Sequence, residues 1–269
     1  LNAFLDIYLV SVWHLGAKGV AMGTVIAEYI ALGAGIFLVS RNISFQQLRH
    51  AFRNMSYRYL AFKPLMRSNR DIWLRTLFLL ASFMVFTHLS ASFGTVTLAA
   101  NHLLLQLISF SAFFLDGYAH IIEAEIGHAL GQQSKERLRA LLKKGWLLSQ
   151  GTALLLATLL FTLAPWYLPL LTDIAEIRVR ADELLIFCCC YVALSASAFQ
   201  LDGVFIGANA SSALRNGSIL ASVFFVGSWF LAGQFAGILG LWLCFIGYVV
   251  MRAIVLAAYL PKLEQQANR

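Results

Sequence analysis

Charged residues are scarce in this chain. Of its 269 residues, 12% are charged and 60% are hydrophobic, and the mean hydropathy is +0.75. A soluble domain of this length needs far more charge to cover its surface. Apolar windows of about 20 residues, the length that crosses the hydrocarbon core of a bilayer, recur along almost the whole chain. They are continuous rather than alternating, which excludes a transmembrane β-barrel and predicts an all-α, polytopic membrane protein.

Cysteine is also rare, with four residues in all. Three of them, Cys188, Cys189 and Cys190, are adjacent within an apolar stretch. Adjacent residues of a helix point in different directions, so these thiols cannot converge on one metal ion. We therefore expect neither a metal site, nor a disulfide framework, nor a cofactor, and interpret the cysteines as small packing residues.

Acidic residues are missing from residues 41–70, which carry seven lysines and arginines. Apolar residues recur there at helical spacing, a pattern typical of an amphipathic segment on a membrane surface. They are Phe45, Leu48, Phe52, Met55 and Tyr59. The segment predicts a division of the chain into the end of one transmembrane lobe (1–40), a basic amphipathic linker (41–71) and a second transmembrane lobe of six helices (72–269).

The spans follow from the apolar windows. The first fourteen residues have the pattern of a helix end, and a turn at residues 16–19 leads into a span at 20–40. Six more spans are predicted after the linker, at 72–93, 95–118, 145–166, 184–206, 218–236 and 239–260. The chain opens on Leu1 within an apolar stretch and no signal peptide precedes it, so we expect a fragment of a longer protein.

The distribution of basic residues predicts the orientation. With the linker in the cytoplasm, fifteen basic residues fall on the inner side and three on the outer side, which satisfies the positive-inside rule. The net charge of +7 thus resides in short segments between spans, and a nucleic-acid partner is not expected. The linker and the C-terminus are predicted to be cytoplasmic.

Three carboxylates, Asp6, Asp116 and Asp202, lie in or at the edge of the predicted helices. A charge at the bilayer centre costs about 2.5–3.5 kcal/mol even on lenient scales, so such residues usually handle ions or substrates. Asn2 and Asp6 are four residues apart and share a helix face, where they would hold a proton or a small cation. The alternative is an aspartate at a helix end near the membrane interface.

The span at 95–118 carries a polar stripe on one side that continues past its end. A polar stripe within a membrane must face protein or water, so this one is expected to line a cavity or to form a static hydrogen-bond network between helices. His102 and His120 are five turns apart and cannot share one ion. The stripe comprises His102, Gln106, Ser109, Asp116, His120 and Glu123.

Arg75, Asp116 and Asp202 fall at a similar inner depth on their helices. Two interpretations stay open for the aspartates: an ion-paired cluster that locks the inner end of the bundle, or an ion site. For Arg75 we favour the lock. Arg252 lies nearer the middle of the membrane and requires a carboxylate, carbonyl or water partner.

An intramembrane hydrolase is a weaker alternative. Ser109 and His102 are about 10 Å apart along the helix axis, too far for a hydrogen bond between nucleophile and base. No Gly-x-Ser-x-Gly motif occurs in the sequence. A purely structural membrane subunit remains an open alternative.

Several stretches resemble the MATE family of multidrug and toxic-compound extrusion transporters, and within it the DinF-like branch. They are LNAFLDIYLV with GAKGVAMGTVIAEY, NRDIWLRTLFLL, LAANHLLLQLISFSAFFLDGYAHIIEAEIGHALG, and FQLDGVFIGANASSALRNG. The resemblance covers essentially the whole chain. It implies twelve helices in two six-helix lobes, of which this chain would hold the end of helix five, helix six, the linker and helices seven to twelve.

The resemblance also implies a function: export of drugs or of amphipathic or cationic metabolites from a bacterial inner membrane, driven by inward proton or sodium flow through alternating access. Asn2 and Asp6 match an Asn and an Asp of the family's fifth helix that are implicated in coupling. Another branch uses acids on helices seven and ten. Asp202 lies in the helix-ten region, but the span at 72–93 offers Arg75 and no acid, so proton coupling through the first lobe is favoured.

The expected partners are the lipid bilayer and the exported small molecule, and the protein is expected to be monomeric. A flippase for lipid-linked saccharides, from the wider superfamily with this architecture, is the alternative within transport. Such a protein needs a strongly cationic cavity, whereas only Arg75 and Arg252 lie within the predicted spans.

Overall fold

The computed structural model describes residues 1–42 and 59–266. The chain separates into two compact units, Leu1–Pro64 and Leu65–Arg269. Most of the predicted amphipathic segment, from Phe45 to Met55, lies outside the described residues. Seven of the described helices are long and apolar enough to cross a membrane. The expectation of an all-helical polytopic protein is confirmed.

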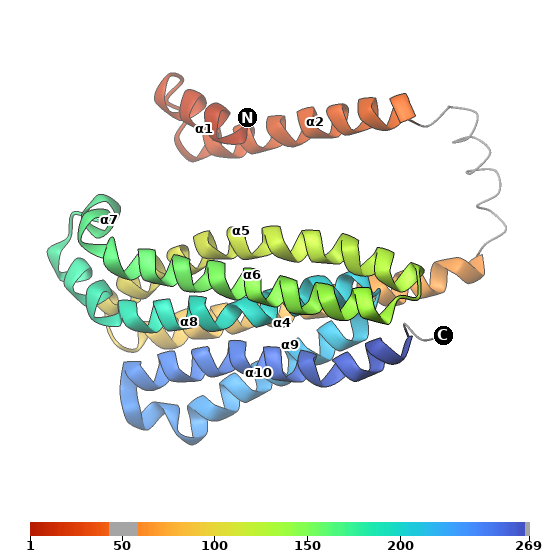
Figure 1. Ribbon diagram of the computed structural model, residues 1–269. Coiled ribbons are helices and arrows are strands. Elements are labelled where there is room, and N and C mark those ends of the chain that lie inside the picture. The colour runs from red at the N-terminus through yellow and green to blue at the C-terminus, as the bar shows by residue number, and fades with distance from the viewer. Residues whose placement is uncertain (43–58, 267–269) are drawn as a thin grey trace. The chain divides into compact units, whose positions relative to one another are not determined.

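Residues 1–42 of the first unit form α1 (Asn2–Ser11) and α2 (Gly16–Asn42), which pack against each other (Figure 1). The chain reverses between them with positive φ angles of 53° at His14 and Gly16. Gly16 adopts this left-handed conformation without steric cost. Because α2 begins at Gly16, the predicted turn at residues 16–19 is already the first turn of that helix.

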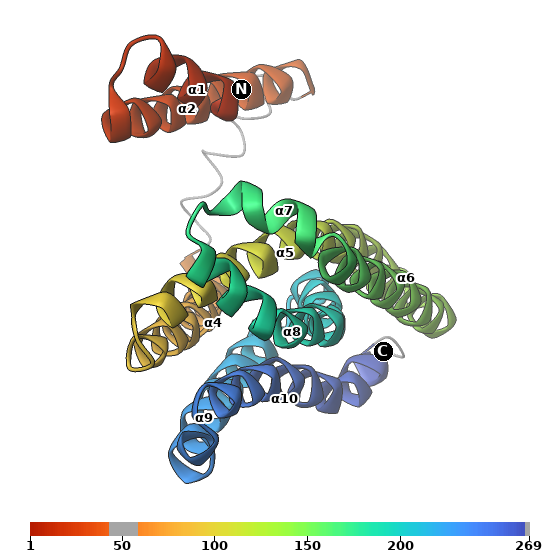
Figure 2. The ribbon, with the colours of Figure 1, turned by 90° about the vertical axis from the view of Figure 1, so that its left-hand side faces the viewer.

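The second unit is a bundle of six long helices. They are α4 (Tyr59–Ala91), α5 (Thr95–Gly131), α6 (Lys135–Thr162), α8 (Ala175–Gly207), α9 (Ser211–Leu231) and α10 (Gly237–Gln266). A short helix, α7 (Ala164–Leu171), and a 3₁₀ turn, Gly233–Ala236, complete the connections. Helix α8 lies at the centre, enclosed by α5, α6 and α10 (Figure 2).

Small residues allow α5 and α8 to approach closely. Gly203 and Gly207, one turn apart on α8, face the backbone carbonyls of Ala119 and Glu123 on α5, and a Cβ atom on either glycine would overlap the facing oxygen. Transmembrane helices associate through such close contacts, because lipid gives no hydrophobic drive for burying one apolar helix against another.

Aromatic rings fill the core between α4, α8 and α10. The ring of Phe245 lies 4.4 Å from that of Phe86 and 4.7 Å from that of Tyr191, centroid to centroid. Trp242 packs edge-on against Phe86 at 5.0 Å. Rings at these separations attract one another beyond the area that they bury, and they fix the rotation of the three helices about their axes.

The long helices extend past the spans predicted from hydropathy. Helix α5 continues from residue 118 to Gly131, and α6 begins at Lys135 rather than at residue 145. Backbone hydrogen bonding does not stop at the membrane surface, and the charged extensions pair with each other: Arg137 on α6 donates to Glu125 on α5 at 2.9 Å.

The span predicted for residues 145–166 is interrupted after Thr162. Pro165 lacks an N–H group and its ring clashes with the carbonyl four residues earlier, so α6 ends at Thr162 and Pro165 lies in the first turn of α7. Pro169 lies inside α7.

Candidate functional site: buried charges in the membrane helices

Asn2 and Asp6 lie together on one face of α1. In the orientation that satisfies both side chains, the amide nitrogen of Asn2 donates to both carboxylate oxygens of Asp6, at 3.1 and 3.2 Å. The hydroxyl of Thr24 on α2 lies 3.4 Å from the same end of the Asn2 side chain. The site therefore consists of one carboxylate with neutral hydrogen-bonding partners.

Gly23 on α2 makes room for this carboxylate. A Cβ atom at Gly23 would overlap an oxygen of Asp6, so the carboxylate rests directly against the backbone of the neighbouring helix. Asp6 is half-buried within the unit, and Gly23 is buried. Among the residues that the structure describes, no cationic side chain pairs with Asp6.

In the second unit, three of the predicted charges meet. Arg75 on α4 and Arg252 on α10 both donate a hydrogen bond from Nη2 to the same oxygen, Oδ2, of Asp202 on α8. The side chains of Asp202 and Arg252 are 6% and 4% exposed, so neither charge is solvated by water. Asp202 is thus the partner that Arg252 requires in the middle of the membrane.

Arg75, Asp202 and Arg252 form a charged triad, and some of its hydrogen-bonding atoms are unused. Oδ1 of Asp202 and the Nε atoms of both arginines are buried without a partner among the described residues. Such atoms are costly to leave unpaired in a site of low dielectric constant. The guanidinium of Arg252 also lies 6.0 Å from the ring of Phe199, within cation–π range.

Asp116 lies within electrostatic reach of the triad from α5. Two arginines and one aspartate carry a net charge of +1, and Asp116 brings the group of four to neutrality. Unlike Asp202, Asp116 is exposed on the surface of the unit and forms no ion pair with either arginine. The two aspartates therefore differ: two arginines hold Asp202, whereas Asp116 is exposed and pairs with neither of them.

The polar stripe lies on the outer face of α5. His102, Gln106, Asp116 and His120 are exposed, while the opposite face of the helix is buried in the bundle. One residue of the stripe lies near a charged group of the same helix: Nδ1 of His120 is 3.6 Å from a carboxylate oxygen of Glu123. The sequence left two interpretations of the stripe open, a cavity wall or a static hydrogen-bond network between helices. Within the described residues of the second unit, these side chains do not form such a network.

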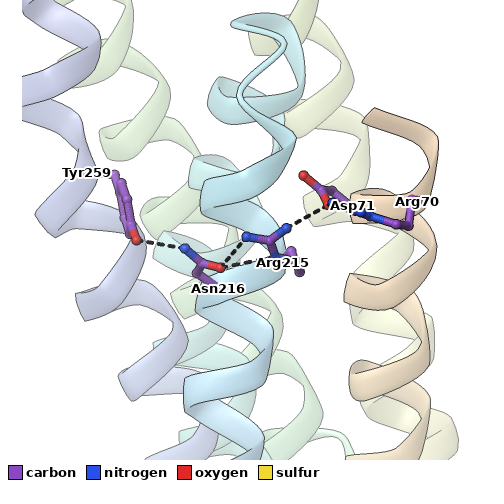
Figure 3. A network of polar contacts seen from close by, with 5 residues as sticks. All are labelled: Arg70, Asp71, Arg215, Asn216 and Tyr259. Atoms are coloured by element: carbon purple, nitrogen blue, oxygen red, sulfur yellow. Dashed lines mark hydrogen bonds and ion pairs between the residues drawn. The ribbon is translucent and has the colours of Figure 1, made fainter. Parts of the chain in front are cut away.

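A second buried carboxylate, Asp71 on α4, was not expected from the sequence. It is 1% exposed and accepts from Arg215 of α9 at 2.8 Å and from Arg70 at 3.2 Å (Figure 3). Asn216 accepts from Arg215 and donates to the hydroxyl of Tyr259 on α10 at 3.0 Å. This network joins three helices at the end of the bundle that carries the basic residues.

An uncharged network was also missed. Asn101 on α5 donates to the hydroxyl of Ser90 on α4 at 2.9 Å and accepts from the indole N–H of Trp242 on α10 at 3.0 Å. Asn101 is 1% exposed. It lies one residue before the predicted stripe, on the buried face, so the spacing of polar residues along the stripe gave no signal for it.

Long apolar helices with paired charges buried between them define a polytopic membrane protein. The MatE family model matches residues 72–224, more than half of the chain. DNA damage-inducible protein F of Escherichia coli (strain K12) is 33% identical over 263 residues, which are 96% of this chain and 56% of that protein. The chain belongs to the MatE family of multi-pass membrane transporters and is DinF-like.

Solved structures have the same fold. The Vibrio cholerae MATE transporter VcmN in its bent form superposes with a TM-score of 0.80 at 23% identity, over 100% of this chain and 60% of that one. The MATE transporter ClbM in complex with Rb⁺ gives a TM-score of 0.75 at 15% identity, over 99% and 59%. The chain thus spans somewhat less than two thirds of these relatives. Membership of a transporter family sets the hydrolase alternative aside.

Proposed function

We propose that this chain is part of a secondary antiporter that exports amphipathic or cationic compounds and is driven by inward proton flow. The observation that carries the proposal is the Asn2–Asp6 pair. This half-buried carboxylate has an amide and a hydroxyl near it and is pressed against the backbone at Gly23, and none of the described residues supplies a cation to neutralise it. Such a group is stabilised by taking up a proton or a small cation.

Comparison with Asp202 supports the choice of Asp6. Asp202 is neutralised by two arginines, so protonating it would leave both guanidinium groups buried without a counter-charge. Protonating Asp6 leaves no buried charge unpaired, because its partners are neutral. A solved MATE structure, that of ClbM, contains Rb⁺, which supports a site for a monovalent cation in the family and keeps sodium as the alternative coupling ion.

The exposed stripe on α5 supplies the polar wall of a substrate cavity in this proposal. His102, Gln106, Asp116 and His120 lie along one face of a membrane helix and are not covered by the second unit. Polar groups at that depth require protein or water beside them. Alternating access would expose this wall first to one side of the membrane and then to the other.

The remaining parts of the proposal concern location and organisation. Residues 1–40 form the end of one lobe, residues 41–71 a cytoplasmic linker, and residues 72–269 a second lobe. The protein resides as a monomer in the inner membrane of a bacterium, with the linker and the C-terminus in the cytoplasm. The positive-inside count supports this orientation.

The charges weigh against the flippase alternative. A carrier of phosphate-bearing lipid needs free cationic groups in its cavity, whereas Arg75 and Arg252 are both engaged by Asp202. Asp202 balances part of their charge, so less cationic charge remains for a phosphate than two unpaired arginines would offer.

The test is export of a fluorescent cationic dye from cells that express the complete gene, under an imposed proton or sodium gradient. We expect proton-driven export by the wild type, loss of export in Asp6→Asn, and unchanged export in the control Asp173→Asn, which alters an exposed aspartate outside the spans. Full export by Asp6→Asn would remove this residue from the mechanism. Absence of export by the wild type under both gradients would contradict the multidrug assignment and favour the flippase.

A further inference from the structure

A groove of about 540 Å³ opens on the surface of the second unit between α6, α8 and α10. Its walls are apolar along most of its length, with Leu142 from α6, Leu201 from α8 and Leu260 from α10. Its floor is hollow because Ala253 and Ala257, one turn apart on α10, carry only methyl groups. All three helices are long and apolar enough to cross a membrane.

One end of the groove is positively charged. Arg139 and Lys143 line it from α6, and Glu264 lines it from α10. Glu264 accepts from Arg139 at 2.7 and 3.2 Å and lies 4.0 Å from the ammonium group of Lys135. Lys143 forms no ion pair within the described part of the chain. Two cations, Arg139 and Lys135, therefore share one carboxylate, and Lys143 adds a positive charge without a partner there, so this end has an excess of positive charge.

A hydrogen-bonded tryptophan lines the groove deeper than the charged residues of α6. The indole N–H of Trp146 donates to the hydroxyl of Ser197 on α8 at 3.0 Å. Trp146 follows Lys143 by three residues, about one helical turn deeper along α6. Tryptophan favours the level of the lipid headgroups and the glycerol region, with its polar edge hydrogen-bonded and its ring in apolar surroundings.

The order of groups along the groove matches a phospholipid. Cations at one end meet the phosphate, and the apolar remainder of the groove, which includes the leucines, the indole ring and the alanines, accepts an acyl chain. We propose that the groove binds one anionic phospholipid, with its headgroup at Arg139 and Lys143. Negatively charged lipids attract basic residues next to a span by about 1 kcal/mol for each residue.

A second copy of the chain fits the groove less well. A two-fold interface places the same patch of each subunit against the other, so the excess positive charge of the two grooves would be brought together. A zwitterionic lipid fits the apolar part equally well but leaves the excess charge uncompensated. The net charge of the occupant is therefore the property to test.

The complete protein is placed in nanodiscs of phosphatidylcholine that contain either brominated phosphatidylglycerol or brominated phosphatidylcholine at equal mole fraction. Bromine on the acyl chains quenches nearby tryptophan, and the Trp146→Phe variant gives the signal of all the other tryptophans. We expect the fluorescence of Trp146 to report a preference of about fivefold or more for the anionic lipid, the factor that one basic residue supplies.

Two pairs of variants separate the groove from its surroundings. Lys143→Ala should remove most of the preference, while Lys144→Ala, at an exposed lysine that does not line the groove, should retain it. Ala257→Leu should fill the floor and reduce quenching by both lipids. Ala258→Leu, on the neighbouring exposed position outside the groove, should leave quenching unchanged.

Three results would overturn the proposal. Equal quenching by the two brominated lipids would show binding without selection for charge. Equal effects of Lys143→Ala and Lys144→Ala would show general attraction to the anionic surface. Quenching by neither lipid would show that protein, for example a second copy, covers the groove.

Discussion

Replacing Asp202 by asparagine should destabilise the protein strongly, because the substitution leaves two buried arginines without their counter-charge. The side chain of Arg252 is 4% exposed and that of Arg75 is 19% exposed. Removing one partner of a buried ion pair costs about 3–5 kcal/mol. At about 2–4 °C for each kcal/mol, the midpoint of thermal unfolding should fall by roughly 6–20 °C.

The assay is thermal unfolding of the purified protein in detergent, followed by intrinsic fluorescence. Asp173→Asn makes the same chemical change at an exposed position and should stay within about 0.5 kcal/mol of the wild type. The double variant Asp202→Asn with Arg252→Gln should recover part of the loss, since one of the two uncompensated charges is gone. If Asp202→Asn unfolds at the temperature of the wild type, the triad does not stabilise the bundle and our reasoning is refuted.

Three further outcomes are expected. Gly203→Ala should lower the free energy of unfolding by about 1–3 kcal/mol, because its methyl group would overlap a carbonyl of α5. Gly151→Ala is the control, since its methyl group would enter open space. Equal thermal midpoints for the two variants would contradict the close contact between α5 and α8. Asn101→Leu should cost about 1–3 kcal/mol by leaving the indole N–H of its partner tryptophan unpaired, as thermal unfolding would measure. Gly23→Ala should lower dye export severalfold at unchanged expression by displacing the carboxylate of Asp6, and full export would show that the position of this carboxylate is not critical.

The spans of this fold were predictable because the bilayer imposes length and apolarity on each of them. The helix ends were not. The first ten residues of α6 and the last thirteen of α5 are amphipathic and charged, so hydropathy assigns them to loops although their backbone remains helical. Their ion pairs with neighbouring helices, such as Arg139 with Glu264, depend on positions in space that a hydropathy profile does not contain.

The candidate sites, too, could be predicted from the sequence only in part. Each member of the triad was identified as a charge within a span, and Arg252 was expected to need a partner, but only the rotation of α4, α8 and α10 about their axes selects Asp202. Asp71 was missed because it follows a run of basic residues at the predicted end of the linker. An acidic residue at such a position is expected to be solvated rather than buried. In the structure Asp71 is instead buried and paired with Arg215 of α9, a contact that depends on how α4 and α9 pack.

The central claim is that Asp6 exchanges a proton for the exported compound. The most direct measurement is the release of protons when a cationic substrate is added to the purified complete protein in weakly buffered detergent, followed with a pH indicator. The account predicts proton release by the wild type and by Asp173→Asn, and none by Asp6→Asn. Equal release by Asp6→Asn would contradict the claim and place the coupling proton on another residue.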